Sequence, residues 1–176
     1  MRTFIRRALG SALADAGTYE EIREDRDSFS QAIAILVALS LLAAVSAYLD
    51  EENSLSAAVA EFLASWLGWA MQYALLYIFG SKMRREVEQP PTIAQLVSTV
   101  TFSYFAVLFL LLALVPVVGT LLGAVAALWY FIAYVVSVRA AFVFSTLWDA
   151  IVLAVVCGMV QVLPQILVLT FFNPFR

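Results

Sequence analysis

A stretch of 50 residues without a single charge, from Gln89 to Val138, places the strongest limit on what this chain can fold into. As one straight helix it would be about 75 Å long, more than twice the roughly 30 Å hydrocarbon core of a bilayer. The stretch must therefore fold back on itself. Pro116 and Gly119 mark the expected break, because proline removes a backbone donor and glycine tolerates a tight turn.

The composition indicates that a membrane is the solvent of this chain. Hydrophobic residues make up 64% of the 176 residues, charged residues make up 13%, and the mean hydropathy is +0.94. A soluble domain of this size cannot bury so much apolar surface, because small domains have a high surface-to-volume ratio. We therefore expect an all-α polytopic membrane protein, since helices satisfy their backbone hydrogen bonds internally.

Five apolar segments are long enough to cross a bilayer as helices. Charged residues end the first segment and separate the second from the third, and Arg139 and Asp149 flank the connection between the last two. The predicted transmembrane helices cover residues 28–49, 57–80, 92–115, 117–138 and 150–172. We expect them to form one domain, residues 28–176, preceded by a cytoplasmic N-terminal segment, residues 1–27.

The N-terminal segment is expected to begin with a short amphipathic helix, Arg2–Ala16, that lies in the membrane interface. Its apolar residues recur at the spacing of one helical face. They are Phe4, Ile5, Ala8, Leu9, Ala12 and Leu13. Arg2, Arg6 and Arg7 flank this face and are expected to contact lipid headgroups.

A second short, charged helix is expected after Gly17. Thr18 and Glu21 have the spacing of a capping box, in which the two side chains bond each other's backbone amides. We expect no cleavable secretory signal, because Asp15 interrupts a short apolar stretch that acidic residues then follow. The alternative for the whole segment is a frayed N-terminal tail.

Basic residues concentrate on one side of the predicted topology. Nine of the ten lie in the N-terminal segment, the loop after the second span and the short loop after the fourth, and the tenth is the terminal Arg176. Cytoplasmic loops carry an excess of Lys and Arg. The N-terminus is therefore expected in the cytoplasm and the C-terminus on the opposite side.

The residue types that are missing exclude several kinds of chemistry. The chain has no histidine and one cysteine, Cys157, which excludes a Ser-His-Asp site, a His-ligated metal centre, an intrachain disulfide and an iron–sulfur cluster. We expect no catalytic residue, no cofactor and no metal. The net charge of −3 offers no broad basic surface, so we expect no nucleic-acid partner.

Polar residues inside the predicted spans follow helical stripes. In the second span, Glu61, Ser65, Gly68 and Gln72 share one face, and the three later spans carry similar small or polar faces. Polar groups are costly in lipid, so these faces should meet protein or water. The stripes either pack helices together through hydrogen bonds or line a solute path, in which case Glu61 and Gln72 are the candidate functional residues.

Two further pairs of residues are candidates for a structural or functional role. Gly119 and Gly123 match a close-packing motif for neighbouring helices. Arg139 and Asp149 flank the last cytoplasmic loop and are expected to pair across it, which at the surface would contribute little to stability.

Several short segments resemble the core of the Yip family, five-span membrane proteins named for their interaction with Ypt/Rab GTPases. The resemblance rests on Tyr104–Phe109, Leu114–Gly119, Trp129, Val138–Ser145 and Ala150. The Pro-x-x-Gly turn and the Arg-x-x-x-x-x-Ser segment are similar to the bacterial branch, which implies a bacterial cytoplasmic (inner) membrane. The resemblance also implies five spans with a cytoplasmic N-terminus, but it transfers no functional residue and no GTPase-binding role.

These observations favour a non-enzymatic membrane protein that organises membrane partners or lipid. A narrower version is an accessory subunit of a larger membrane complex. The expected partners are the lipid bilayer and other membrane subunits rather than a small-molecule substrate. The alternative is a small transporter or channel that uses the polar stripes around Glu61 and Gln72. An intramembrane enzyme would need paired reactive groups, and the topology places its two candidates, Glu61 and Asp149, near opposite faces.

Overall fold

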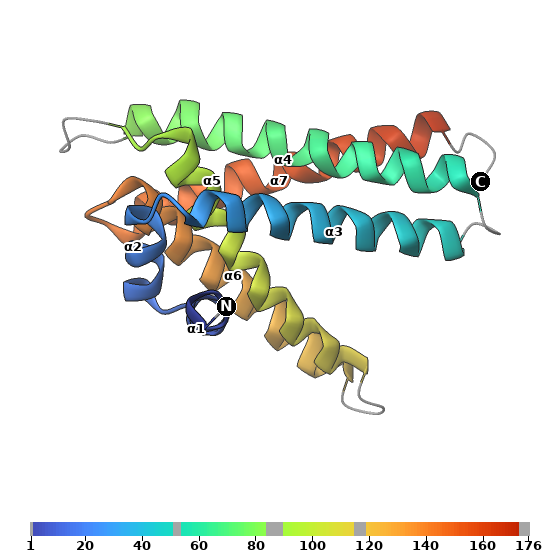
Figure 1. Cartoon of the computed structure of the whole chain (residues 1–176). Helices are drawn as coiled ribbons and strands as arrows, with labels where there is room; N and C mark the ends of the chain where they lie inside the picture. The colour runs from blue at the N-terminus through green and yellow to red at the C-terminus, as the bar shows by residue number, and fades with distance from the viewer. Residues whose placement is uncertain (1, 51–53, 84–89, 115–118, 173–176) are drawn as a thin grey trace.

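The structure, a computed structural model, describes residues 2–50, 54–83, 90–114 and 119–172, and it describes side chains up to residue 159 apart from residues 50 and 110–114. Within these ranges the ordered elements are all helices, as the sequence predicts (Figure 1). The elements are α1 (Arg2–Ala12), α2 (Ala16–Glu24), α3 (Ser28–Asp50), α4 (Leu55–Met83), α5 (Ile93–Phe102), η1 (Ser103–Leu114), α6 (Gly119–Phe142) and α7 (Leu147–Phe172).

Three of the helices, α3, α4 and α6, are long and apolar enough to cross a membrane. Two further apolar segments, residues 93–109 and residues 147–159, are shorter over the part of the chain whose side chains are described, although the backbone of α7 continues to Phe172. The third predicted span is not one α-helix, because η1 continues α5 as a 3-10 helix. Since a 3-10 helix has three residues per turn, side chains three apart lie above one another on η1.

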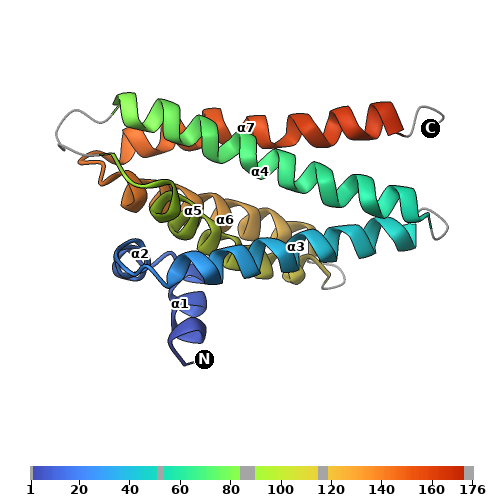
Figure 2. The same ribbon diagram turned by 45° about the horizontal axis from the view of Figure 1, so that its top comes forward.

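The long helices α3, α4 and α7 run side by side, whereas α6 and η1 diverge from them toward one end of the molecule (Figure 1). The view in Figure 2 shows α1 and α2 lying beside the start of α3. The connection from α6 to α7 lies at the same end of the molecule as α2 and the start of α3 (Figure 1). The main core joins α3, α4, α5, α6 and α7, and its fully buried side chains include Leu76, Leu96, Val138 and Phe142.

Side-chain caps explain where three helices begin. Thr92 and Gln95 form a capping box at the start of α5. Thr146 accepts a hydrogen bond from the Asp149 backbone amide at the start of α7. At α2 the expected capping box is wrong, because the Asp15 carboxylate accepts hydrogen bonds from both the backbone amide and the hydroxyl of Thr18. An N-cap aspartate satisfies a helix amide that has no partner within the helix.

A tight contact joins Gly80 of α4 to the Phe142 side chain at the end of α6. A methyl group at Gly80 would overlap the Phe142 ring. The ring has little room to move, because Phe142 is completely buried and stacks on Phe144 at 5.4 Å between ring centroids. Gly158 of α7 differs, since an added methyl group would lie at an ordinary 3.6 Å from Tyr134.

Gly80→Ala is expected to destabilise the protein by about 1–3 kcal/mol, because it overpacks a rigid contact. Gly158→Ala is the matched control and should be neutral or slightly stabilising, since alanine favours a helix. Thermal unfolding in detergent, followed by circular dichroism, measures both effects. Equal unfolding midpoints for the two variants would contradict the tight contact.

Candidate functional site

The polar stripe of α4 turns into the bundle. Ser65, Gly68 and Gln72 are buried, and Glu61 is half-buried near the start of the helix. Gln72, the deepest polar group, is only 1% exposed. A buried amide in an apolar surrounding needs partners, so its hydrogen bonds decide what this stripe does.

Gln72 bonds two tyrosines that come from different helices. Its Nε2 donates to the Tyr134 hydroxyl of α6 at 2.8 Å, and its Oε1 accepts from the Tyr104 hydroxyl of η1 at 3.0 Å. Nearby, the hydroxyls of Tyr73 and Thr101 share a hydrogen bond of 2.8 Å between α4 and α5. We call Tyr104, Gln72 and Tyr134 the triad; it ties α4, η1 and α6 together.

Aromatic rings extend the triad. Tyr130 stacks between Tyr104 and Tyr134, with ring centroids 6.1 and 6.4 Å away. Trp69 lies one turn from Gln72 on α4, and its ring is 6.3 Å from that of Tyr104. Offset aromatic pairs stabilise beyond their buried area, so this row reinforces the hydrogen bonds of the triad.

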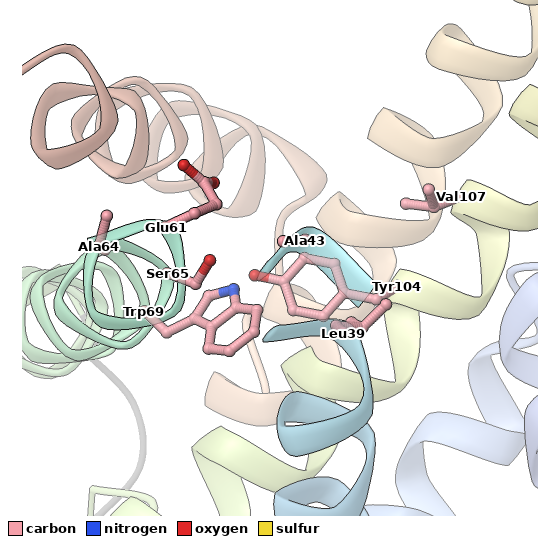
Figure 3. Close-up of a pocket in the computed structure, with 9 residues that line it drawn as sticks. Leu39, Ala43, Glu61, Ala64, Ser65, Trp69, Tyr104 and Val107 are labelled. Carbon is pink, nitrogen blue, oxygen red and sulfur yellow. The ribbon is translucent and has the colours of Figure 1, made fainter. Parts of the chain in front are cut away.

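Two cavities lie beside the triad. The first, of about 210 Å³, is lined by Glu61, Ser65, Trp69 and Tyr104 together with small and apolar neighbours (Figure 3). The second, of about 430 Å³, is lined by Gln72 and Tyr134 together with residues of α6 and α7. Because Tyr104 lines the first cavity and the other two members of the triad, Gln72 and Tyr134, line the second, the triad stands between them.

The expected pair of Arg139 and Asp149 is wrong. Arg139 Nε donates to the backbone carbonyl of Phe144 at 3.3 Å, which closes the turn after α6. The Asp149 carboxylate accepts from the Thr146 hydroxyl at 2.7 Å and completes the cap of α7. Arg139 therefore stabilises the end of α6 and Asp149 stabilises the start of α7. The ion pairs of the described residues include none between these two side chains.

The arginines of α1 lie differently from one another. Arg7, expected at the lipid headgroups, is instead 5% exposed, and its Nη2 lies 3.0 Å from Glu21 and 2.6 Å from Asp25. A buried guanidinium must be paired, which explains why it turns toward the carboxylates of the next helix. Arg6 also bonds Glu21 but is 67% exposed, and Arg2 is exposed, so a headgroup contact of these two stays a prediction.

Further hydrogen bonds join the two N-terminal helices to each other and to α6. The hydroxyl of Tyr19 donates to the carbonyl of Ser11 at 2.9 Å, and Trp129 Nε1 of α6 donates to that of Ala12 at 2.8 Å. These are carbonyls of the last turn of α1, which have no partner within the helix. Arg23 reaches the carbonyl of Ala140 at 3.1 Å.

The expected apolar face of α1 is divided between the bundle and the exterior. Phe4 packs edge-on against Phe102 and Phe105. On the outward side, Ile5, Leu9 and Leu13 are 48%, 61% and 62% exposed. Helix α1 is therefore anchored by one side and presents an apolar stripe on the other.

The carboxylates at this docking site are held in their charged form. A backbone hydrogen bond from Asp27 and then the Arg7 guanidinium lower the pKa of Asp25, and the hydrogen bonds of Thr18 lower the pKa of Asp15. Burial, the largest influence on Arg7, lowers the pKa of its guanidinium, but the hydrogen bonds and charges of Asp25 and Glu21 outweigh it and leave the pKa raised. Burial raises the pKa of the Tyr19 phenol.

The expected close-packing pair, Gly119 and Gly123, lies on α6. Gly119 is buried and Gly123 is half-buried on α6, and their part in helix packing stays a prediction. Sequence reasoning missed Gly80, Tyr73, Thr101 and the partners of Gln72. The four-residue spacing of Tyr130 and Tyr134 was the one available sequence signal for the stacked rings.

Together these features define an integral membrane protein, with apolar helices, a polar network tied inside the bundle and a docked N-terminal helix pair. The family model of the Yip1 domain matches residues 10–169, and the chain belongs to this family. No curated protein matches the chain, and no solved structure matches it either.

Gln72→Leu is expected to destabilise the protein by about 1–3 kcal/mol, because two buried hydroxyls lose a partner in a low-dielectric surrounding. Tyr134→Phe should cost clearly less in the Gln72→Leu background than in the wild type, since the bond is already gone. Thermal unfolding in detergent of the two single variants and the double variant measures this coupling. Strictly additive losses would show that the triad does not act as a unit.

The docking of α1 is expected to weaken as the pH falls below about 4. The folded-state pKa of Asp25 lies below its ordinary value near 3.9, so its contribution is complete above that value and is lost on acidification. Hydrogen exchange of the α1 amides, measured against pH, should report the change. Asp25→Asn should speed exchange at neutral pH and flatten the acid dependence, whereas Glu20→Gln, on the exposed side of α2, should follow the wild type.

Proposed function

We propose that this Yip-family protein is a non-enzymatic membrane protein that organises membrane partners or lipid, as a scaffold or as an accessory subunit of a larger complex. The observation that carries this proposal is that buried polar side chains of the bundle form hydrogen bonds with one another. Gln72, Tyr104 and Tyr134 bond across three helices, which is a packing role. The outward apolar stripe of α1 adds a surface suited to lipid or to a neighbouring membrane subunit.

The proposed topology has five crossings, with the N-terminus in the cytoplasm of a bacterial cell and the C-terminus on the other side of its inner membrane. It is supported by the basic residues, which concentrate in the N-terminal segment and in two connecting loops. The arrangement in Figure 1 is compatible with it, because α1, α2, the start of α3 and the α6–α7 connection lie at one end.

The alternative function is a small transporter or channel. The first cavity favours it, because Glu61 and Ser65 of the predicted stripe both line that cavity. A path would also have to pass the triad, where Tyr104, Gln72 and Tyr134 hold one another at hydrogen-bonding distance. The direct hydrogen bonds of the triad therefore favour the organising role over a solute path.

We expect the tagged protein, purified from its native host in nanodiscs, to bring along one or more membrane proteins in near-stoichiometric amounts. Quantitative mass spectrometry measures the ratio, with an identically tagged unrelated membrane protein as the background control. Glu61→Gln should leave the ratio unchanged, because organising partners does not use the cavity. Recovery of the protein alone, together with solute flux into liposomes that Glu61→Gln abolishes, would replace this proposal with the transporter.

A further inference from the structure

The first cavity carries a carboxylate next to aromatic rings. Glu61, Ser65 and Trp69 come from one face of α4, at positions i, i+4 and i+8, and Tyr104 faces them from η1 (Figure 3). Val107 lines the cavity with Tyr104, because residues three apart stack on a 3-10 helix. The helix type of η1 thus aligns this wall, and no local sequence pattern predicted it.

Glu61 is the only charged group among the cavity-lining residues. The described residues give its carboxylate no hydrogen bond and no ion pair. It lies six residues into α4, about 9 Å along the helix, within an apolar part of the chain. A carboxylate in such a place is costly unless it is paired, so a cation is the complementary occupant.

The rings of the cavity select the kind of cation. Trp69 and Tyr104 both line the cavity, each is 7% exposed, and their ring centroids lie 6.3 Å apart with the ring planes at 46°. Tryptophan and tyrosine faces attract organic ammonium groups that lie within about 6 Å. A calcium or magnesium ion needs six or more oxygen ligands, whereas this lining offers one carboxylate and two hydroxyls among its side chains.

The size of the cavity agrees with an organic cation. Its volume of about 210 Å³ is several times the roughly 30 Å³ that a water molecule occupies in the liquid. Leu39 and Ala43 of α3 supply apolar lining, which suits methyl or methylene groups. An acyl chain would fill the apolar part but would leave Glu61 without a partner.

We propose that this cavity binds an organic ammonium group, with Glu61 balancing its charge and with Trp69 and Tyr104 facing its alkyl groups. The ammonium group belongs either to an amine-bearing lipid headgroup or to a free organic cation. The site adds a ligand to the protein and does not depend on the organising role, since that role is tested by partner recovery.

Isothermal titration calorimetry with tetramethylammonium chloride tests the free cation, using protein in nanodiscs of phosphatidylglycerol alone and sodium chloride as the ionic-strength control. Native mass spectrometry tests the lipid, using protein released from nanodiscs of equal phosphatidylethanolamine and phosphatidylglycerol. Glu61→Gln should weaken the binding at least tenfold, and Glu20→Gln should leave it unchanged. Trp69→Phe, which keeps a ring, should weaken it less than Trp69→Leu. Circular dichroism confirms that each variant is folded.

Saturable binding of tetramethylammonium that requires Glu61 would establish a site for a free organic cation. Retention of phosphatidylethanolamine over phosphatidylglycerol that requires Glu61, without tetramethylammonium binding, would establish a lipid headgroup site. Absence of both, or binding that Glu61→Gln and Trp69→Leu leave unchanged, would overturn the proposal.

Discussion

The absence of water inside a bilayer is the constraint on which the rest of this structure depends. Every backbone amide must find a partner within the protein, which helices provide, and every buried polar side chain must do the same. Gln72 meets this requirement through Tyr104 and Tyr134, which come from helices distant in the sequence. Its two hydrogen bonds therefore fix the relative positions of α4, η1 and α6.

The N-terminal helices obey the same rule at the edge of the bundle. Arg7 is buried, so it takes Glu21 and Asp25 as partners and joins α1 to α2. Trp129 then satisfies a carbonyl at the end of α1 and joins that helix to α6. The consequence for function is an apolar stripe held at a defined place, because the opposite side of α1 is bonded to the protein.

The stripe of α4 holds polar groups of two kinds, those that pair within the bundle and a carboxylate at a cavity. The triad belongs to the first kind, since each of its members bonds a neighbour. Glu61 belongs to the second kind, because it lines a cavity and the described residues offer it no partner. One stripe on α4 thus holds a structural residue and a candidate ligand-binding residue, 11 positions apart.

The sequence by itself determined that the chain is helical, apolar and membrane-embedded, and it found the inward face of α4. Composition and helical period suffice for these conclusions, because the bilayer permits few other solutions. Only the tertiary structure decided the partners: Arg7 turned inward, Arg139 and Asp149 stayed apart, and Gly80 met Phe142. Such pairings depend on the relative placement of helices far apart in the chain, which a local pattern of residues does not encode.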